Sequence, residues 1–126
     1  MRLLLDTNVF LWTLTSPSRL SAAAAAAIEA NENRVYVSVV SPWEISIKAS
    51  RGNLPAFDDI GPQLDEMGFD LLPIALAHTK AIESLPHHHR DPFDRMMIAQ
   101  AQVEGLALVT SDRDMRRYPV ALLPAL

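Results

Sequence analysis

The stretch Val35-Tyr36-Val37-Ser38-Val39-Val40 is followed directly by Ser41-Pro42-Trp43-Glu44. A short run of β-branched and aromatic residues predicts a buried strand. Ser at an N-cap, Pro at the first helical position and Glu three residues after the cap form a helix-start signal. The sequence therefore predicts a strand over 35–40 and a helix from Pro42, with Glu44 in its first turn.

Three more acidic residues end predicted strands or begin predicted helices. Asp6 ends a run of three leucines, and Asp112 follows the buried-strand pattern of residues 106–109 after a short turn. The segment Asp91-Pro92-Phe93-Asp94 repeats the helix-start pattern seen before. The carboxyl ends of parallel strands meet at one edge of a sheet, where ligands bind in such folds. We therefore expect one acidic cluster made of Asp6, Glu44, Asp94 and Asp112.

Carboxylates held within a few ångströms of one another either take up protons or need a cation. Mg²⁺ and Mn²⁺ are hard ions that prefer oxygen ligands, so either one suits an all-carboxylate site. The chain has no cysteine, and its four histidines fall outside a zinc-like spacing. The pattern therefore indicates a Mg²⁺ or Mn²⁺ site for phosphate chemistry.

Length and composition agree with one globular domain. The chain has 126 residues, of which 49% are hydrophobic, so we expect a single domain over residues 1–126. The leucines before Asp6 are too few for a signal-peptide core, and no apolar run approaches membrane-spanning length. These features predict a cytoplasmic protein without a membrane partner.

The net charge of −4 argues against a nucleic-acid partner, because polyanion binding is largely electrostatic. Bound metal would neutralise the four acids, which weakens that argument. Basic residues flank the acids, and they fit either a rim that receives a phosphodiester or ordinary solvated helix faces. They are Lys48, Arg51, Arg90, Arg95, Arg113, Arg116 and Arg117.

Strand-like and helix-like patterns alternate along the chain, as a parallel sheet with crossover helices requires. This predicts an α/β fold. The first predicted strand ends at Leu5, and the other predicted strands cover 35–40, 69–72, 106–109 and 120–123. The predicted helices cover 7–15, 22–30, 42–52, 60–67, 75–85 and 95–103, and a loop covers 53–55.

Each acid also has a structural interpretation. Asp6 fits a helix N-cap, and Glu44 fits the far half of a capping box. Asp91 and Asp94 fit the N-cap and third residue of one helix, and Asp112 fits a cap for the segment after it. The convergence of four such positions favours a shared site.

The consecutive histidines His87, His88 and His89 cannot easily converge on one ion. We expect a solvated loop near the site, with His89 as a phosphate contact. The aromatic residues Trp12, Trp43 and Phe93 follow helical apolar patterns and are predicted to lie in the core.

Four segments together resemble a PIN domain and, more narrowly, the VapC toxins of bacterial type II toxin–antitoxin systems. The resemblance covers nearly the whole chain, with the segments in the family order. The segments are Leu4-Leu5-Asp6-Thr7-Asn8, Trp43-Glu44-Ile45, His89 to Arg95 followed by Ile98-Ala99-Gln100-Ala101, and Val109-Thr110-Ser111-Asp112.

The resemblance implies a three-layer α/β/α fold with a mostly parallel sheet of about five strands. It implies a metal-dependent endoribonuclease that uses one or two Mg²⁺ or Mn²⁺ ions, with Asp6, Glu44, Asp94 and Asp112 as the ligands. Many relatives have Asn at the position of Asp112 and an acid three residues later. Here Asp114 follows after two residues, so the fourth ligand is Asp112 or Asp114.

The resemblance also implies an RNA substrate, a small antitoxin partner and a homodimer, for which exposed apolar surface on the early helices would supply the interface. Six further residues are candidates for orienting the ligands or contacting substrate. They are Thr7, Asn8, Asp91, Arg95, Thr110 and Asp114.

Two alternatives belong to other functional classes. A phosphoacceptor receiver domain shares this length and fold class, but it needs adjacent acids after the first strand and a lysine after the last. Here Thr7-Asn8 follow Asp6, and no lysine lies beyond Lys80. The other alternative is a catalytically silent PIN-like domain that binds RNA or a protein.

Overall fold

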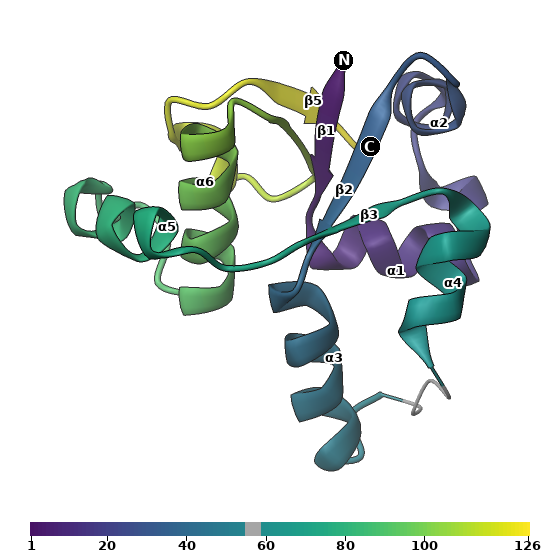
Figure 1. Cartoon of the computed structure of the whole chain (residues 1–126), viewed down its shortest axis with the longest axis horizontal. Coiled ribbons are helices and arrows are strands. Elements are labelled where there is room, and N and C mark those ends of the chain that lie inside the picture. Colours follow the sequence, from purple (N-terminus) through teal and green to yellow (C-terminus); the bar gives the residue numbers. More distant parts are fainter. Residues whose placement is uncertain (55–58) are drawn as a thin grey trace.

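The computed structural model describes residues 1–54 and 59–126, so Pro55 of the predicted 53–55 loop lies outside the described residues. Figure 1 shows the elements in chain order. They are β1 (Arg2–Leu5), α1 (Thr7–Thr15), η1 (Pro17–Arg19), α2 (Ala22–Glu29), β2 (Arg34–Ser38), α3 (Val40–Ser50), α4 (Ile60–Met67), β3 (Asp70–Leu72), α5 (Leu76–Ala81), η2 (Ile82–Ser84), α6 (Pro92–Glu104), β4 (Ala107–Thr110), η3 (Met115–Arg117) and β5 (Leu122–Pro124).

The sheet has five strands in the order β3-β2-β1-β4-β5, and its four strand pairings are parallel. The central strand β1 pairs on both sides, with Leu4 opposite Tyr36 of β2 and Leu108 of β4. The crossover from β1 to β2 passes through α1 and α2, as parallel pairing requires. The predicted α/β fold with a parallel sheet is confirmed.

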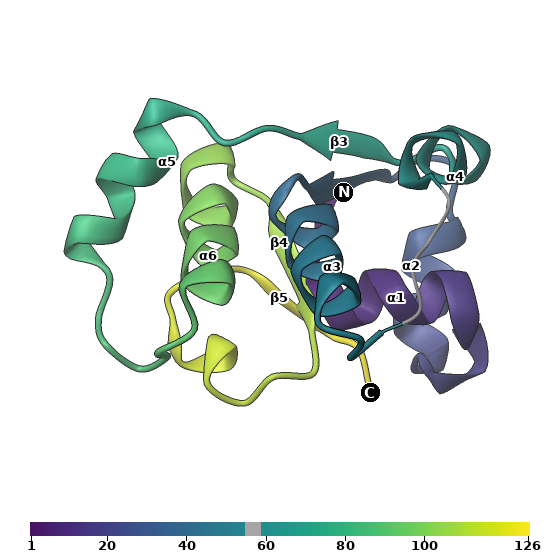
Figure 2. The same ribbon diagram turned by 90° about the horizontal axis from the view of Figure 1, so that it is seen from below.

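Alternation along β1 produces two cores. Leu3 and Leu5 face one side and pack with α1, α2 and α4, whereas Leu4 faces the other side and packs with α6. All three leucines are buried. Figure 2 shows helices on both sides of the sheet, with α6 and α5 on one side and α1, α2 and α4 on the other. The predicted three-layer α/β/α arrangement is thus confirmed.

The start of α3 differs from its prediction. The strand β2 ends at Ser38 and the helix begins at Val40, so Ser41 is a helical residue and not an N-cap. The hydroxyl of Ser38 accepts a hydrogen bond from the Val40 amide at 3.1 Å and fills part of the expected role. Because the helix starts earlier, Glu44 lies in its second turn and takes no part in a capping box.

The predicted helix over 75–85 is also shorter than expected. It is α-helical from Leu76 to Ala81 and continues as the 3-10 turn η2 to Ser84. The last strand starts two residues later than predicted and ends one residue later, at Pro124, which a strand at the sheet edge tolerates.

The shared strand direction positions the acidic residues. Since every pairing is parallel, the strands end at the same edge, from which α1 and α3 leave and at which α6 begins (Figure 1). Within residues 1–54 and 59–126, no helix has the length and apolar character needed to cross a membrane.

Candidate metal centre

The carboxyl edge of the sheet carries a small polar hollow of about 170 Å³. It is lined by acids from the end of β1, from α3, from the start of α6 and from the segment after β4. The lining residues are Asp6, Thr7, Asn8, Glu44, Lys48, Asp91, Asp94 and Asp112. The four acids grouped by sequence analysis therefore lie around one space.

Asp6 is only 4% exposed and is tied down at both carboxylate oxygens. Its Oδ1 accepts from the Val9 amide at 2.8 Å, which makes Asp6 the N-cap of α1, and its Oδ2 accepts from the Thr110 hydroxyl. Burial raises the pKa of Asp6 to about 6, although both hydrogen bonds oppose the shift and the negative charges of Asp112 and Glu44 support it. The N-cap interpretation and the site interpretation are therefore compatible.

Glu44 has one satisfied and one unsatisfied oxygen. Its Oε2 pairs with the Lys48 ammonium at 3.0 Å, one helical turn away. Its Oε1 is buried and has no hydrogen-bond partner among the described residues. A buried acceptor without a partner carries a desolvation penalty that a cation or water removes. The residues lining the hollow therefore fit an oxygen-liganded cation.

Asp94 stands at the start of α6, next to the N-cap. The side chain of Asp91 accepts from the Phe93 and Asp94 amides at 2.8 and 3.2 Å, so the predicted helix start is confirmed. Burial is the main reason that the pKa of Asp94 rises to about 7, and the charge of Asp91 adds to it. A carboxyl group with this pKa is only partly ionised near neutral pH, and a bound cation favours its charged form.

Asp112 differs from Asp6 and Asp94 because hydrogen bonds from the protein stabilise its charged form. Its Oδ1 accepts from the Asp114 and Met115 amides at 2.7 and 3.1 Å, so it does cap the segment that follows. Burial alone would raise the pKa of Asp112, but the bond from His89 and these amides outweigh it and lower the pKa. Asp114 is exposed, lies 4.0 Å from Arg117 and does not line the hollow.

The sequence predicted that His89 lies near the site, but not that it contacts two of the acids. Its Nε2 lies 3.0 Å from Asp94 Oδ2 and 3.1 Å from Asp112 Oδ2, so it is not part of a free solvated loop. Its Nδ1 accepts from the Asp91 amide at 3.0 Å. Burial alone would lower the pKa of His89, but the bond to Asp112 and the charges of Asp94 and Asp112 outweigh it and raise the pKa. In the sequence, the one local indication of these contacts was that His89 lies two residues before the helix cap Asp91.

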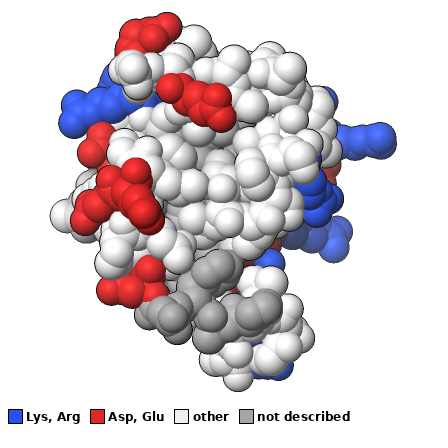
Figure 3. All heavy atoms as spheres, turned by 90° about the vertical axis from the view of Figure 1, so that its right-hand side faces the viewer, with Lys and Arg blue, Asp and Glu red and all other residues white. Residues whose placement is uncertain are grey.

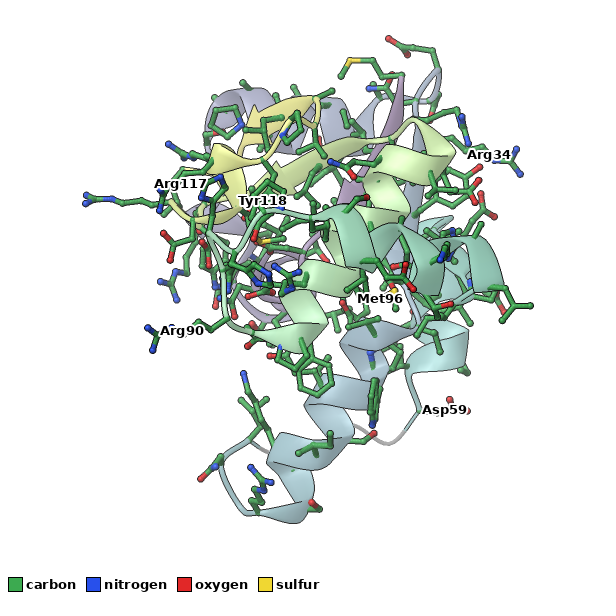
Figure 4. All side chains as sticks on the ribbon, turned by 90° about the vertical axis from the view of Figure 1, so that its left-hand side faces the viewer. Arg34, Asp59, Arg90, Met96, Arg117 and Tyr118 are labelled. Atoms are coloured by element: carbon green, nitrogen blue, oxygen red, sulfur yellow. The ribbon has the colours of Figure 1, made fainter. Side chains whose placement is uncertain are left out.

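The loop before α6 is fixed by Tyr118. The Tyr118 hydroxyl accepts from the His88 and His89 amides at 3.1 and 2.9 Å and donates to the Pro86 carbonyl at 2.8 Å. Arg95 donates to the same carbonyl at 2.9 Å, so its guanidinium holds the loop and does not face the acids. Figure 4 shows Tyr118 against the body of the protein, whereas Arg90 extends away from it.

A second grouping overlaps the hollow on its outer side. Ligand atoms of His89, Asp112 and Asp114 lie within 4.8 Å of one another. Two of the three residues already use oxygen or nitrogen atoms for the hydrogen bonds of the loop. Among the four acids, Glu44 has a buried oxygen without a hydrogen-bond partner in the described part of the chain, and Glu44 lines the hollow. We therefore place the candidate cation in the hollow.

Of the remaining candidate residues, some line the hollow and others lie away from it. Thr7 lines the hollow, but its hydroxyl bonds to Ser41 at 2.9 Å, and Asn8 lines the hollow from an exposed position. Among the predicted basic rim, Lys48 lines the hollow. Arg90, Arg113, Arg116 and Arg117 are exposed.

The prediction that Trp43 lies in the core is wrong. The residue is 54% exposed, and its ring meets Phe93 edge to face with centroids 4.8 Å apart. The helical pattern was correct, but α3 projects beyond the sheet (Figure 1), so this side of the helix has less to pack against.

The protein is an α/β/α domain with a parallel five-stranded sheet and a cluster of carboxylates at the strand ends. It therefore belongs to the class of α/β domains that carry an acidic site at the carboxyl edge of the sheet. A family model for the PIN domain matches residues 3–121, and the chain belongs to the PIN domain family. The family predicted from sequence is confirmed.

Relatives and solved structures agree with this assignment. The chain is 30% identical over 118 residues to the ribonuclease VapC22 of Mycobacterium tuberculosis, covering 91% of this chain and 90% of the relative. The fold is similar to that in VapBC2 from Rickettsia felis bound to a promoter DNA fragment, with a TM-score of 0.76, 16% identity and full coverage of both chains. It is also similar to a toxin–antitoxin complex from Klebsiella pneumoniae, with a TM-score of 0.67, 19% identity and 95% and 94% coverage.

Proposed function

We propose that this protein is a metal-dependent endoribonuclease and the toxin of a type II toxin–antitoxin pair. The observation that carries the proposal is the hollow lined by Asp6, Glu44, Asp94 and Asp112, in which Glu44 Oε1 is buried without a partner. Membership of the PIN domain family and likeness to a ribonuclease support the substrate class. The same family assignment removes the reason to consider a receiver domain.

The four acids would hold the cation, and the oxygen-only ligand set favours Mg²⁺ or Mn²⁺. A bound divalent ion lowers the pKa of a coordinated water, so that hydroxide is available near neutral pH. Attack by water does not need the 2′-hydroxyl, so we expect products with 3′-hydroxyl and 5′-phosphate ends.

The chain's own residues prepare the ligands. Thr110 and the Val9 amide hold Asp6 in one orientation, and Lys48 holds one oxygen of Glu44. The amides after Asp112 hold its Oδ1. Fixed ligands of this kind lose less conformational freedom when the cation and the phosphodiester arrive.

An antitoxin helix would fit an apolar groove between α1, α2 and α4, of about 310 Å³. Its lining residues are Thr13, Pro17, Leu20, Ala25, Ile28, Glu29, Met67 and Phe69. Figure 3 shows this side of the molecule, where a broad uncharged area lies between acidic groups on one side and basic groups on the other. An amphipathic helix with basic residues on one flank and acidic residues on the other complements that surface.

A homodimer would use a different surface. Leu71, Ile74 and Leu76 are exposed at the edge strand β3 and the start of α5, and Leu76 is 87% exposed. Exposed apolar side chains beside an open sheet edge favour self-association. We therefore propose this surface for the dimer, in place of the early helices expected from the sequence, and we propose the early helices for the antitoxin.

The test is cleavage of a pool of tRNA and rRNA by antitoxin-free protein in Mg²⁺, Mn²⁺ or EDTA. Asp94→Asn should abolish discrete metal-dependent fragments, and Asp65→Asn, an exposed acid on α4, should not. Equal fragment patterns from the wild type and Asp94→Asn would identify a contaminant. RNA binding without cleavage in any metal would support a silent binding domain instead.

A further inference from the structure

We propose that His89 is an internal substitute for the cation: it holds the metal-free centre together and releases its two carboxylates when a divalent ion binds. The proposal rests on the metal centre of the proposed function. It assigns a positioning role to a residue that is itself neither a metal ligand nor a hydroxide source.

The position of the ring is the first argument. The Nε2 atom lies between Asp94 and Asp112, 3.0 Å from one carboxylate and 3.1 Å from the other. Two carboxylates at this separation repel each other unless a positive or hydrogen-donating group lies between them. His89 thus contacts two of the predicted ligands beside the hollow, where its hydrogen offsets their negative charges as a cation would.

The hydrogen positions on the ring follow from its other contact. Because Nδ1 accepts from the Asp91 amide at 3.0 Å, the hydrogen of the ring lies on Nε2. A nitrogen that carries a hydrogen donates to carboxylates but offers no lone pair to a metal. In this pose His89 therefore stabilises the acids and cannot ligate the ion.

Asp112 makes His89 and the cation competitors for one oxygen. Its Oδ1 already accepts from the Asp114 and Met115 amides at 2.7 and 3.1 Å, so Oδ2 is the atom left for a cation. That oxygen is the one bonded to His89. A cation bound through Asp112 Oδ2 draws electron density from that oxygen and brings a positive charge towards the hydrogen on Nε2, so the ring and the cation compete for the oxygen.

The loop permits this release. The His88 and His89 amides are bonded to the Tyr118 hydroxyl at 3.1 and 2.9 Å, and these bonds do not involve the ring. The side chain can therefore leave the acids while the backbone stays anchored. The anchoring also shows that the ring's position is built by the fold and is not an accident of a loose loop.

The experiment compares wild type, His89→Ala, His89→Gln and the control His87→Asn, which changes an exposed residue of the same loop. Two quantities are measured: the melting temperature in EDTA and the affinity for Mn²⁺ by calorimetry. We expect His89→Ala to melt about 3–5 °C lower in EDTA and to bind Mn²⁺ about fivefold more tightly. His89→Gln keeps a side-chain N–H donor and should restore both values, and His87→Asn should change neither.

Opposite changes in the two quantities distinguish a cation substitute from other roles. Weaker Mn²⁺ binding by His89→Ala would identify a ligand and overturn the proposal, as would a loss of stability with unchanged affinity. Unchanged values for both would also overturn it. Failure of wild type and His89→Ala alike to bind any divalent ion would instead overturn the proposed function.

A spectroscopic measurement tests the release directly. On addition of Mg²⁺, the ring nitrogen signals of His89 should shift, whereas those of the buried His78, which bonds to Glu104 at 2.9 Å, should stay in place. An unmoved His89 signal at saturating Mg²⁺ would contradict the proposal even if the affinities behaved as expected.

Discussion

Thr110 donates its hydroxyl hydrogen to Asp6 Oδ2 across 104 positions of the chain. The contact exists because β1 and β4 are neighbours in the sheet, which brings the ends of both strands together. It fixes one oxygen of the most buried acid in the centre, and it is fully enclosed by the protein.

Thr110→Val should weaken the metal centre with little change in shape. Valine fills nearly the same volume but cannot donate, so Asp6 loses a bond that favours its charged form. We expect Mn²⁺ affinity to fall on the order of tenfold, as for other groups that orient metal ligands. Calorimetry measures this, with Thr15→Val on the exposed end of α1 as the control. Equal affinities for the two variants would mean that the bond does not orient Asp6.

The stability of the metal-free protein should fall as pH rises from about 5 to 7.5. The pKa values of Asp6 and Asp94 rise from 3.8 to about 6 and about 7 on folding, so the folded state holds protons that the unfolded state has lost. The stabilisation from these protons is complete below the unfolded pKa and disappears as pH passes the folded values. The loss should be on the order of 4 kcal/mol.

Urea unfolding in EDTA across this pH window measures the effect. In Asp94→Asn the slope should be smaller, because one of the two proton-binding groups is gone. Saturating Mg²⁺ should reverse most of the loss, since the cation then compensates the carboxylates. A metal-free stability that stays unchanged over the window would show that the two acids are ordinary solvated groups.

Glu44→Gln should separate stability from metal binding. The change removes one of the crowded negative charges, so the melting temperature in EDTA should stay the same or rise. Mn²⁺ affinity should fall at least tenfold and RNA cleavage about a hundredfold. Glu66→Gln, on the exposed side of α4, is the matched control. A large loss of metal-free stability would indicate that Glu44 is held for structure.

Tyr118→Phe should loosen the loop that carries His89. The phenol hydroxyl makes three bonds to this loop, to the His88 and His89 amides and to the Pro86 carbonyl. We expect a loss of about 1–2 kcal/mol in the free energy of unfolding and faster hydrogen exchange at both amides. Tyr36→Phe on β2 removes the other tyrosine hydroxyl and serves as the control. Unchanged exchange would show that other contacts hold the loop.

Two neighbouring alanines of α2 test the proposed antitoxin groove. Ala25 lines the groove, whereas Ala26 is exposed and does not. Ala25→Arg should abolish co-purification with the protein encoded by the neighbouring reading frame, because the arginine fills the groove, and it should leave RNA cleavage intact. Ala26→Arg should preserve both. Loss of binding in both variants would place the partner on the outer side of α2.

Much of the architecture could be predicted because its signals are local. The alternation of Leu3, Leu4 and Leu5 depends only on the pleat of a strand. The start of α6 depends on the bonds that Asp91 accepts from the amides two and three residues later. The gathering of Asp6, Glu44, Asp94 and Asp112 followed from one further rule, that parallel strands end at the same edge. The motifs that carry the family resemblance are likewise short segments that can be read in order.

Other features depend on which segments the fold places side by side. The role of His89 required the end of β4 to approach the loop before α6, since its partner Asp112 lies 23 positions away. The exposure of Trp43 depended on how far α3 extends past the sheet. The burial of the Ser41 side chain depended on the Thr7 hydroxyl, to which it is hydrogen-bonded. A helix cap or a strand pleat is set by a few neighbouring residues. The partner of a side chain across the sheet edge is set by strand order and packing, which no single segment encodes.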